Sequence, residues 1–250
     1  MRRFLLVLSL YWVCGQSYAE LPKLSYLSED AYPINYRSNN GQASGFSVEL
    51  LKLIWQQLGE PEHSVKIMPW DRAYYLLGQK PNTVLFATVH TPKRDPYFKW
   101  VCAIDNVNIV LMGNNKRHPK LSSLKQLNHL KIGVLRADVG EQILLNNGIE
   151  DENLMFSDSY RHLIKLLLAK RVDFIAGSEQ TIRHAAKQNN YSLKHYEVSW
   201  VLQEQELCYA FNNAVDDAVI GQFQRALEEV KQGSAFKQIL TRYQQQKLNH

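Results

Sequence analysis

Short apolar runs alternate along this chain with segments whose apolar residues recur every three or four positions. In the first third, this pattern predicts strands at 24–28, 64–68 and 83–89 and amphipathic helices at 45–59 and 69–78. Strands and helices that alternate in this order are typical of a parallel sheet with helices on both of its faces.

The same pattern restarts in the middle of the chain. After a strand at 107–113 and a polar break, three further strands are predicted, each followed by a helix. The predicted strands are 131–135, 153–157 and 171–177, and the predicted helices are 138–148, 159–170 and 178–190. Two helical segments, 216–233 and 234–246, close the chain, and we interpret their apolar stripes as core packing. Two α/β units of similar size predict two lobes.

The N-terminus carries a targeting pattern. Arg2 and Arg3 precede the apolar run FLLVLSLYWV, and small residues end the segment at Ser17 and Ala19. This is typical of a secretory signal peptide that is cleaved after Ala19, and the apolar run is too short to span a bilayer. We therefore interpret 1–19 as a signal peptide and expect the mature protein in the periplasm.

Composition and charge narrow the classes of function. The chain is 45% hydrophobic and 21% charged, which indicates a globular protein with a substantial core. The formal net charge of +5 falls to +3 once the two arginines of the predicted signal peptide are removed. No basic stripe or nucleic-acid-binding motif occurs, so nucleic acid is not an expected partner. The nucleophile-elbow, phosphate-loop and dinucleotide motifs of common enzymes are also missing.

The cysteines give no framework for disulfides or zinc. Cleavage after Ala19 leaves Cys102 and Cys208, and no CxxC motif occurs. An oxidising compartment would allow the two to pair, but we expect them to lie apart as small buried hydrophobic residues.

Candidate binding residues follow the predicted strands, because parallel α/β sheets bind ligands beyond the carboxyl ends of their strands. Arg94 follows the strand at 83–89 within HTPKRDPYFKW, where Pro92 and Pro96 stiffen the loop. Its guanidinium suits a carboxylate, although a solvated turn is the alternative. Trp70 could form a flat wall against a ligand or pack on the core.

Five weaker candidates lie after other strands. They are Glu29, Arg136, Asp138, Ser178 and Glu179. The segments that begin at Arg136 and Ser178 open helices and so offer free backbone N–H groups to an anion. Arg136 and Asp138 could equally form a pair on the surface.

Seven blocks of the sequence, taken in order, resemble the family 3 extracellular solute-binding proteins. They are AYPINYRSNNGQASGFSVELLKLIWQQLG, MPWDRAYYLL, TPKRDPYFKW, LSSLKQLNHLKIGVLRADVGEQIL, LIKLLLAKRVDFIAGS, ELCYAFNN and ALEEVKQGSAFKQILTRY. The resemblance implies a type II periplasmic binding fold, in which two α/β lobes are joined by a two-strand hinge with the ligand cleft between them. It implies lobe 1 at 20–104 and 207–250, lobe 2 at 109–201, and the hinge at 104–108 and 202–206.

The resemblance also implies roles for individual residues. Arg94 matches the arginine that grips the ligand carboxylate in amino-acid binders, and Trp70 matches the aromatic residue that stacks on the ligand side chain. Tyr32 lies near the pocket wall of lobe 1.

Four further residues match positions near the ligand carboxylate. Ala87 and Val89 fall where the family often has serine or a similar residue whose backbone also contacts the carboxylate. Asp138 and Val139 fall where lobe 2 offers it backbone N–H groups.

One departure from the family concerns the ligand's ammonium group. The residue after the strand at 171–177 is an aspartate in family members that bind an α-ammonium, whereas here it is Ser178. A serine cannot neutralise an ammonium in a desolvated cleft. Either Glu179, Glu29 or another acid substitutes, or the ligand is not an ordinary α-amino acid.

The resemblance implies capture of an amino acid or related small carboxylate and its delivery to an ABC-type permease in the inner membrane, with no cofactor. Two alternatives stay open. The same module could sense a ligand for a membrane receptor, or it could be a dehydratase-like enzyme. Catalysis would need an acid/base pair in the cleft, and the candidate carboxylates are Glu29, Asp71, Asp138 and Glu179.

Overall fold

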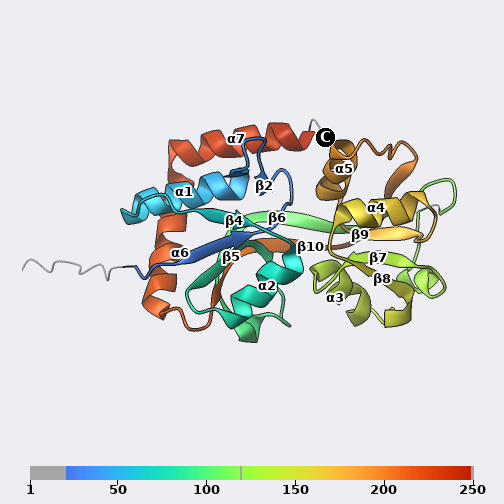
Figure 1. Ribbon diagram of the computed structural model, residues 1–250, viewed down its shortest axis with the longest axis horizontal. Coiled ribbons are helices and arrows are strands. Elements are labelled where there is room, and N and C mark those ends of the chain that lie inside the picture. Colours follow the sequence, from blue (N-terminus) through green and yellow to red (C-terminus); the bar gives the residue numbers. More distant parts are fainter. Residues whose placement is uncertain (1–20, 119, 249–250) are drawn as a thin grey trace, which may run out of the picture.

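The structure is a computed structural model that describes residues 21–118 and 120–248. The predicted signal peptide, 1–19, lies outside these residues. Within the described part of the chain, no helix has the length and apolar character needed to cross a membrane. Two α/β lobes lie side by side along the long axis of the molecule (Figure 1).

Lobe 1 is built on three parallel strands. β1 (Ser25–Ser28) lies between β4 (Val65–Ile67) and β5 (Thr83–Val89). The helices α1 (Phe46–Leu58) and α2 (Trp70–Gln79) connect these strands. The predicted strand at 83–89 matches β5, and α1 ends where Gly59 adopts a left-handed conformation with φ 73°.

The C-terminal helices return to lobe 1. α6 (Asp217–Gln232) and α7 (Ser234–Leu248) pack against α1, as predicted for apolar stripes that form a core. A short hairpin of β2 (Tyr36–Arg37) and β3 (Ala43–Ser44) precedes α1 and has no counterpart in the predicted elements.

Lobe 2 repeats the arrangement. Its parallel strands are β7 (Ile132–Leu135), β8 (Leu154–Ser157) and β9 (Phe174–Ser178), and its helices are α3 (Val139–Asn146), α4 (Tyr160–Leu168) and α5 (Glu179–Gln188). Among the described residues, short 3-10 helices lie in the connections of both lobes: η1 (Asp95–Tyr97) follows β5 in lobe 1, and η2 (Leu124–Leu127) and η3 (Asp151–Asn153) lie in lobe 2.

Two long strands join the lobes. β6 (Phe98–Asn114) and β10 (Tyr196–Asn212) pair antiparallel along their whole length and run from one lobe into the other (Figure 1). The sheet order is β4-β1-β5-β10-β6-β9-β7-β8. The prediction of parallel sheets therefore holds for the outer three strands of each lobe. It fails at the centre, because β10 runs antiparallel to β5 and β6 runs antiparallel to β9.

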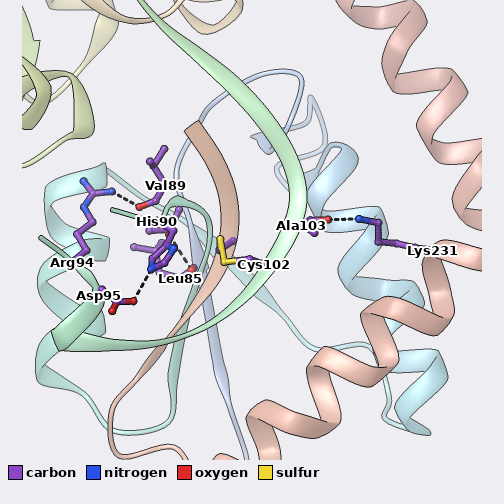
Figure 2. The surroundings of a disulfide bond; sticks show 10 residues. Leu85, Val89, His90, Arg94, Asp95, Cys102, Ala103 and Lys231 are labelled. Atoms are coloured by element: carbon purple, nitrogen blue, oxygen red, sulfur yellow. Dashed lines mark hydrogen bonds and ion pairs between the residues drawn. A yellow bond between two sulfur atoms is a disulfide. The ribbon is translucent and has the colours of Figure 1, made fainter. Parts of the chain in front are cut away.

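A disulfide joins the two long strands where they lie in lobe 1. Cys102 of β6 and Cys208 of β10 are bonded, with their Cα atoms 4.2 Å apart (Figure 2). The expectation that these cysteines lie apart is therefore wrong. They are separated by 106 positions in the sequence, and only the antiparallel pairing of β6 with β10 brings them together.

Candidate ligand-binding site

A cleft between the lobes contains two neighbouring cavities. The outer cavity has a volume of about 350 Å³ and the inner cavity about 50 Å³. Glu29, Tyr160 and Thr181 line both of them. Glu29 follows β1, Tyr160 begins the helix that follows β8, and Thr181 lies in the first turn after β9. The cleft therefore lies at the carboxyl ends of strands from both lobes, where ligands of α/β sheets bind.

Aromatic residues from both lobes line the outer cavity. Trp70 and Tyr32 contribute from lobe 1, and His184 contributes from α5 of lobe 2. The rings of Tyr32 and His184 stack across the cleft, with centroids 3.7 Å apart and planes inclined by 9°. This contact joins the two lobes, so the structure is a closed form.

The inner cavity combines an apolar lining with two carboxyl groups and a few neutral polar groups. Glu29 of lobe 1 and Asp138 of lobe 2 supply the carboxyl groups, and Ser178 lies at its wall. The apolar lining comes from Ala31, Ile34, Ala87, Val89, Val107, Ile109, Val139 and Leu207. The two acids thus face the cleft from opposite lobes in a poorly solvated space.

The surroundings of these acids disfavour their negative charges. Burial, and then the negative charge of Asp138, raise the pKa of Glu29 to about 8, although Arg94 acts in the opposite direction. Burial also raises the pKa of Asp138, against the effects of Arg94 and of the backbone N–H of Val139. That N–H donates to Asp138 Oδ1 at 2.6 Å, so Asp138 also caps α3.

Arg94 lies behind the cleft wall and is only 1% exposed. Its Nη1 donates to Val89 O at 2.9 Å and its Nη2 donates to Ala137 O at 3.1 Å (Figure 2 shows the first of these bonds). Its guanidinium carbon lies 5.0 Å from the Trp70 ring centroid and 5.2 Å from that of Tyr74. Arg94 is not among the described residues that line either cavity.

One backbone carbonyl of lobe 2 receives two donors from lobe 1. The Trp70 indole N–H donates to Ala137 O at 3.0 Å, beside the bond from Arg94. Ala137 has φ 59°, in the left-handed region that L-residues seldom adopt. This backbone conformation helps to aim its carbonyl at lobe 1, so Ala137 is a contact that stabilises closure and that no sequence pattern indicated.

Two of the predicted residues do not enter the cleft. Arg136 is exposed on lobe 2, where its guanidinium carbon lies 5.0 Å from the Phe156 ring centroid. Glu179 accepts a hydrogen bond from Arg183 Nε at 2.8 Å within α5. Of the two acids named as substitutes for the missing aspartate, the structure therefore brings only Glu29 into the cleft.

Tyr160 is a cleft residue that the sequence reasoning missed. The sequence pattern predicts only that it lies in a helix, although its position just after the predicted strand at 153–157 is the signal that marks it as a candidate. The end of its side chain lies over Gly177, where any Cβ atom would overlap the Tyr160 hydroxyl. Gly177 therefore permits Tyr160 to reach both cavities.

We expect Gly177→Ala to destabilise the protein by about 1–3 kcal/mol, because the added methyl group must displace Tyr160. The free energy of unfolding in urea measures this change. Gly78→Ala is the matched control: Gly78 lies in α2 with no atom within 4 Å of the added Cβ, so this change should be neutral or stabilise by up to about 1 kcal/mol. Equal effects of the two substitutions would contradict the packing described for Tyr160.

The chain belongs to the bacterial extracellular solute-binding proteins, family 3, whose family pattern matches residues 26–246. The resemblance seen in the sequence is thereby confirmed. No curated protein sequence matches the chain at a significant level.

Solved structures share the fold at low sequence identity. A histidine kinase sensor domain with similarity to periplasmic binding proteins has a TM-score of 0.76 at 17% identity, covering 88% of this chain and 96% of that chain. The arginine-, lysine-, histidine-binding protein ArtJ from Geobacillus stearothermophilus has a TM-score of 0.74 at 17% identity, covering 88% and 95%. An ancestral arginine-binding protein bound to glutamine has a TM-score of 0.73 at 19% identity, covering 90% and 99%.

These likenesses confirm the predicted fold class of two α/β lobes of the periplasmic-binding-protein type. The family and these structural neighbours are ligand-binding proteins. Binding of a small molecule is therefore the general activity that the family supports for this chain.

Proposed function

We propose that this protein is a periplasmic solute-binding protein that captures a small polar solute between its lobes. The observation that carries the proposal is the closed cleft, in which residues at the strand ends of both lobes enclose a cavity of about 350 Å³. The segment 1–19 would direct export to the periplasm, and an ABC-type permease in the inner membrane would receive the solute. The lobe boundaries and hinge inferred from the sequence are part of this proposal.

Sensing is the second candidate, because a histidine kinase sensor domain shares the fold over 88% of this chain. In that case, the closed form would bind a membrane receptor in place of a permease. Uptake of a labelled ligand by cells with and without the gene distinguishes the two. Transport that is lost with the gene supports delivery, whereas unchanged transport with a lost transcriptional response supports sensing.

We propose binding rather than catalysis. The dehydratase-like alternative requires the carboxyl groups of the cleft to act as an acid/base pair on the bound solute. Incubation of the protein with its ligand, followed by mass spectrometry, tests this point. A ligand that is recovered unchanged supports binding, and turnover contradicts it.

Ligand-induced closure should change the fluorescence of Trp70. Its indole N–H is bonded to lobe 2 in the closed form, so opening of the lobes exposes the ring to water. In a screen of amino acids, amines, small carboxylates and short peptides, a bound solute should change the emission of the wild type, and Trp70→Phe should lose most of that change.

Trp200→Phe is the control for this experiment. Trp200 packs against the core of lobe 2 and does not line the described cavities. This variant should keep the ligand-induced signal. If no solute in the screen changes either the emission or the small-angle scattering of the wild type, the proposal of capture by closure fails.

A further inference from the structure

The deep end of the cleft presents acidic groups to a ligand and no basic ones. Glu29 and Asp138 line the inner cavity, and none of the described residues that line it is a lysine, an arginine or a histidine. Hydroxyl groups from Tyr160, Ser178 and Thr181 and the amide of Asn35 complete its polar lining. A group that enters this end therefore meets carboxyl oxygens and hydroxyls that can accept hydrogen bonds.

Arg94, the cation nearest to this space, is already engaged by the protein. Besides the carbonyls of Val89 and Ala137, it has Gln142 as a partner. With its amide oxygen turned toward the guanidinium, Gln142 lies 3.2 Å from Nη2 and 3.3 Å from Nε. The rings of Trp70 and Tyr74 lie against the same group. A ligand carboxylate would have to break these bonds to reach Arg94.

Two residues that the family resemblance placed near the ligand carboxylate offer it no side-chain donor. Ala87 and Val89 line the inner cavity, and their side chains have no hydrogen-bond donor. A carboxylate placed there would lose its hydration and also lie near two other carboxyl groups, and both effects are unfavourable.

The charges around the deep end leave one negative charge without a partner. Glu29 and Asp138 together carry two negative charges when both are ionised, and Arg94 supplies one positive charge. Burial makes this excess unfavourable, which agrees with the raised pKa of about 8 for Glu29. A cationic group of a ligand would cancel the excess and satisfy the carboxyl oxygens.

The outer cavity carries charges of both signs. Asp30 and Asp158 line it together with Arg37, Arg161 and His184. Arg37 donates to Ile67 O at 2.7 Å and to Gly41 O at 3.3 Å, and Arg161 is exposed. The outer cavity therefore shows no preference for one sign of charge in the rest of the ligand. Its rings of Tyr32 and Trp70 suit an apolar or cationic part of the ligand.

We propose that this cleft selects small primary amines that carry no carboxylate on the carbon next to the amine, with the ammonium group held between Glu29 and Asp138. The inference rests on the proposed function and names its ligand class. In this arrangement, Arg94 hydrogen-bonds lobe 1 to lobe 2. The family resemblance had instead implied that Arg94 binds the carboxylate of the ligand.

Matched pairs of compounds test this proposal on the mature protein. Agmatine differs from arginine, and cadaverine from lysine, only by the loss of the α-carboxylate. In calorimetric titrations and thermal unfolding, an amine should bind at least about tenfold more tightly than its parent amino acid, which corresponds to about 1.4 kcal/mol. If the amino acids bind equally well or better, the inference fails while ligand capture stands. If neither series binds and the wider screen is also silent, both fail.

A Glu29→Gln variant tests the position of the ammonium group. It removes the Glu29 carboxylate, which lines both cavities, and we expect it to weaken amine binding by at least about tenfold. Glu197→Gln is the control, because Glu197 is exposed at the far end of lobe 2 beside Asn115. This variant should bind amines as the wild type does. Equal amine binding by all three proteins would overturn the assignment.

Amine affinity should also rise with pH. The ionised form of Glu29 is the form that binds a cation, and with a pKa of about 8 this form becomes populated as the pH rises from about 6 to about 9. The rise should be absent in Glu29→Gln. A wild-type affinity that falls between about pH 6 and about pH 8 would contradict the proposal, because alkylammonium groups stay protonated in that range.

Discussion

An Arg94→Ala variant is expected to lose about 3–5 kcal/mol of its free energy of unfolding even without ligand, because the guanidinium is fully buried and is the cation nearest to two acids of the cleft. The substitution removes the Arg94 donor from Val89 O and one of the two donors to Ala137 O, and it leaves a space beside the stacked rings of Trp70 and Tyr74. Urea unfolding of the mature protein measures this loss.

Lys93→Ala is the matched control for this prediction, since Lys93 is the exposed neighbour of Arg94 and should change stability by no more than about 0.5 kcal/mol. Arg94→Lys provides a second variant that keeps the charge but cannot reach all of the same partners, and we expect intermediate stability. A small loss in Arg94→Ala, combined with complete loss of ligand binding, would instead support the carboxylate grip that the family resemblance implied.

Removal of the disulfide should cost about 2–5 kcal/mol, because Cys102 and Cys208 close a long loop in the unfolded chain. Their separation of 106 residues places the bond in the range in which the chain-entropy model predicts a large effect. The change to make is Cys102→Ala together with Cys208→Ala, and thermal unfolding without reductant gives the measurement.

A reductant provides the control for the disulfide prediction. Dithiothreitol should destabilise the wild type and leave the double variant unchanged. Because the bond joins β6 to β10 in lobe 1 and the cleft lies between the lobes, we expect the double variant to bind ligand while it is folded. Equal stability of the two proteins without reductant would contradict the stabilising role.

The local elements of both lobes could be predicted from the sequence, because periods of two and of about 3.6 residues depend only on neighbouring positions. β5 matches its predicted strand, and α1 ends at the predicted glycine. The location of the cleft was also predictable, since the strand-end rule places Glu29, Trp70 and Asp138 at one edge of the sheets.

The long strands and the disulfide were not predictable in the same way. β6 contains polar residues such as Asp105 and Asn106, which interrupt its apolar pattern, so only its second half was identified from the residues. Its length depends on pairing with β10, which is distant in the sequence. The pairing of Cys102 with Cys208 follows from that same register.

The sequence by itself determined that this chain forms two α/β lobes and belongs among the solute-binding proteins, because periodicity and ordered motifs are properties of contiguous residues. The tertiary structure alone decided how the charges of the cleft are arranged. It places Glu29 in the cleft opposite Asp138 of the other lobe, and it joins Arg94 to a carbonyl of lobe 2 that is 43 positions away. The physical reason is that the surroundings of a buried charge depend on groups brought together by folding, and these surroundings set its pKa and its partners.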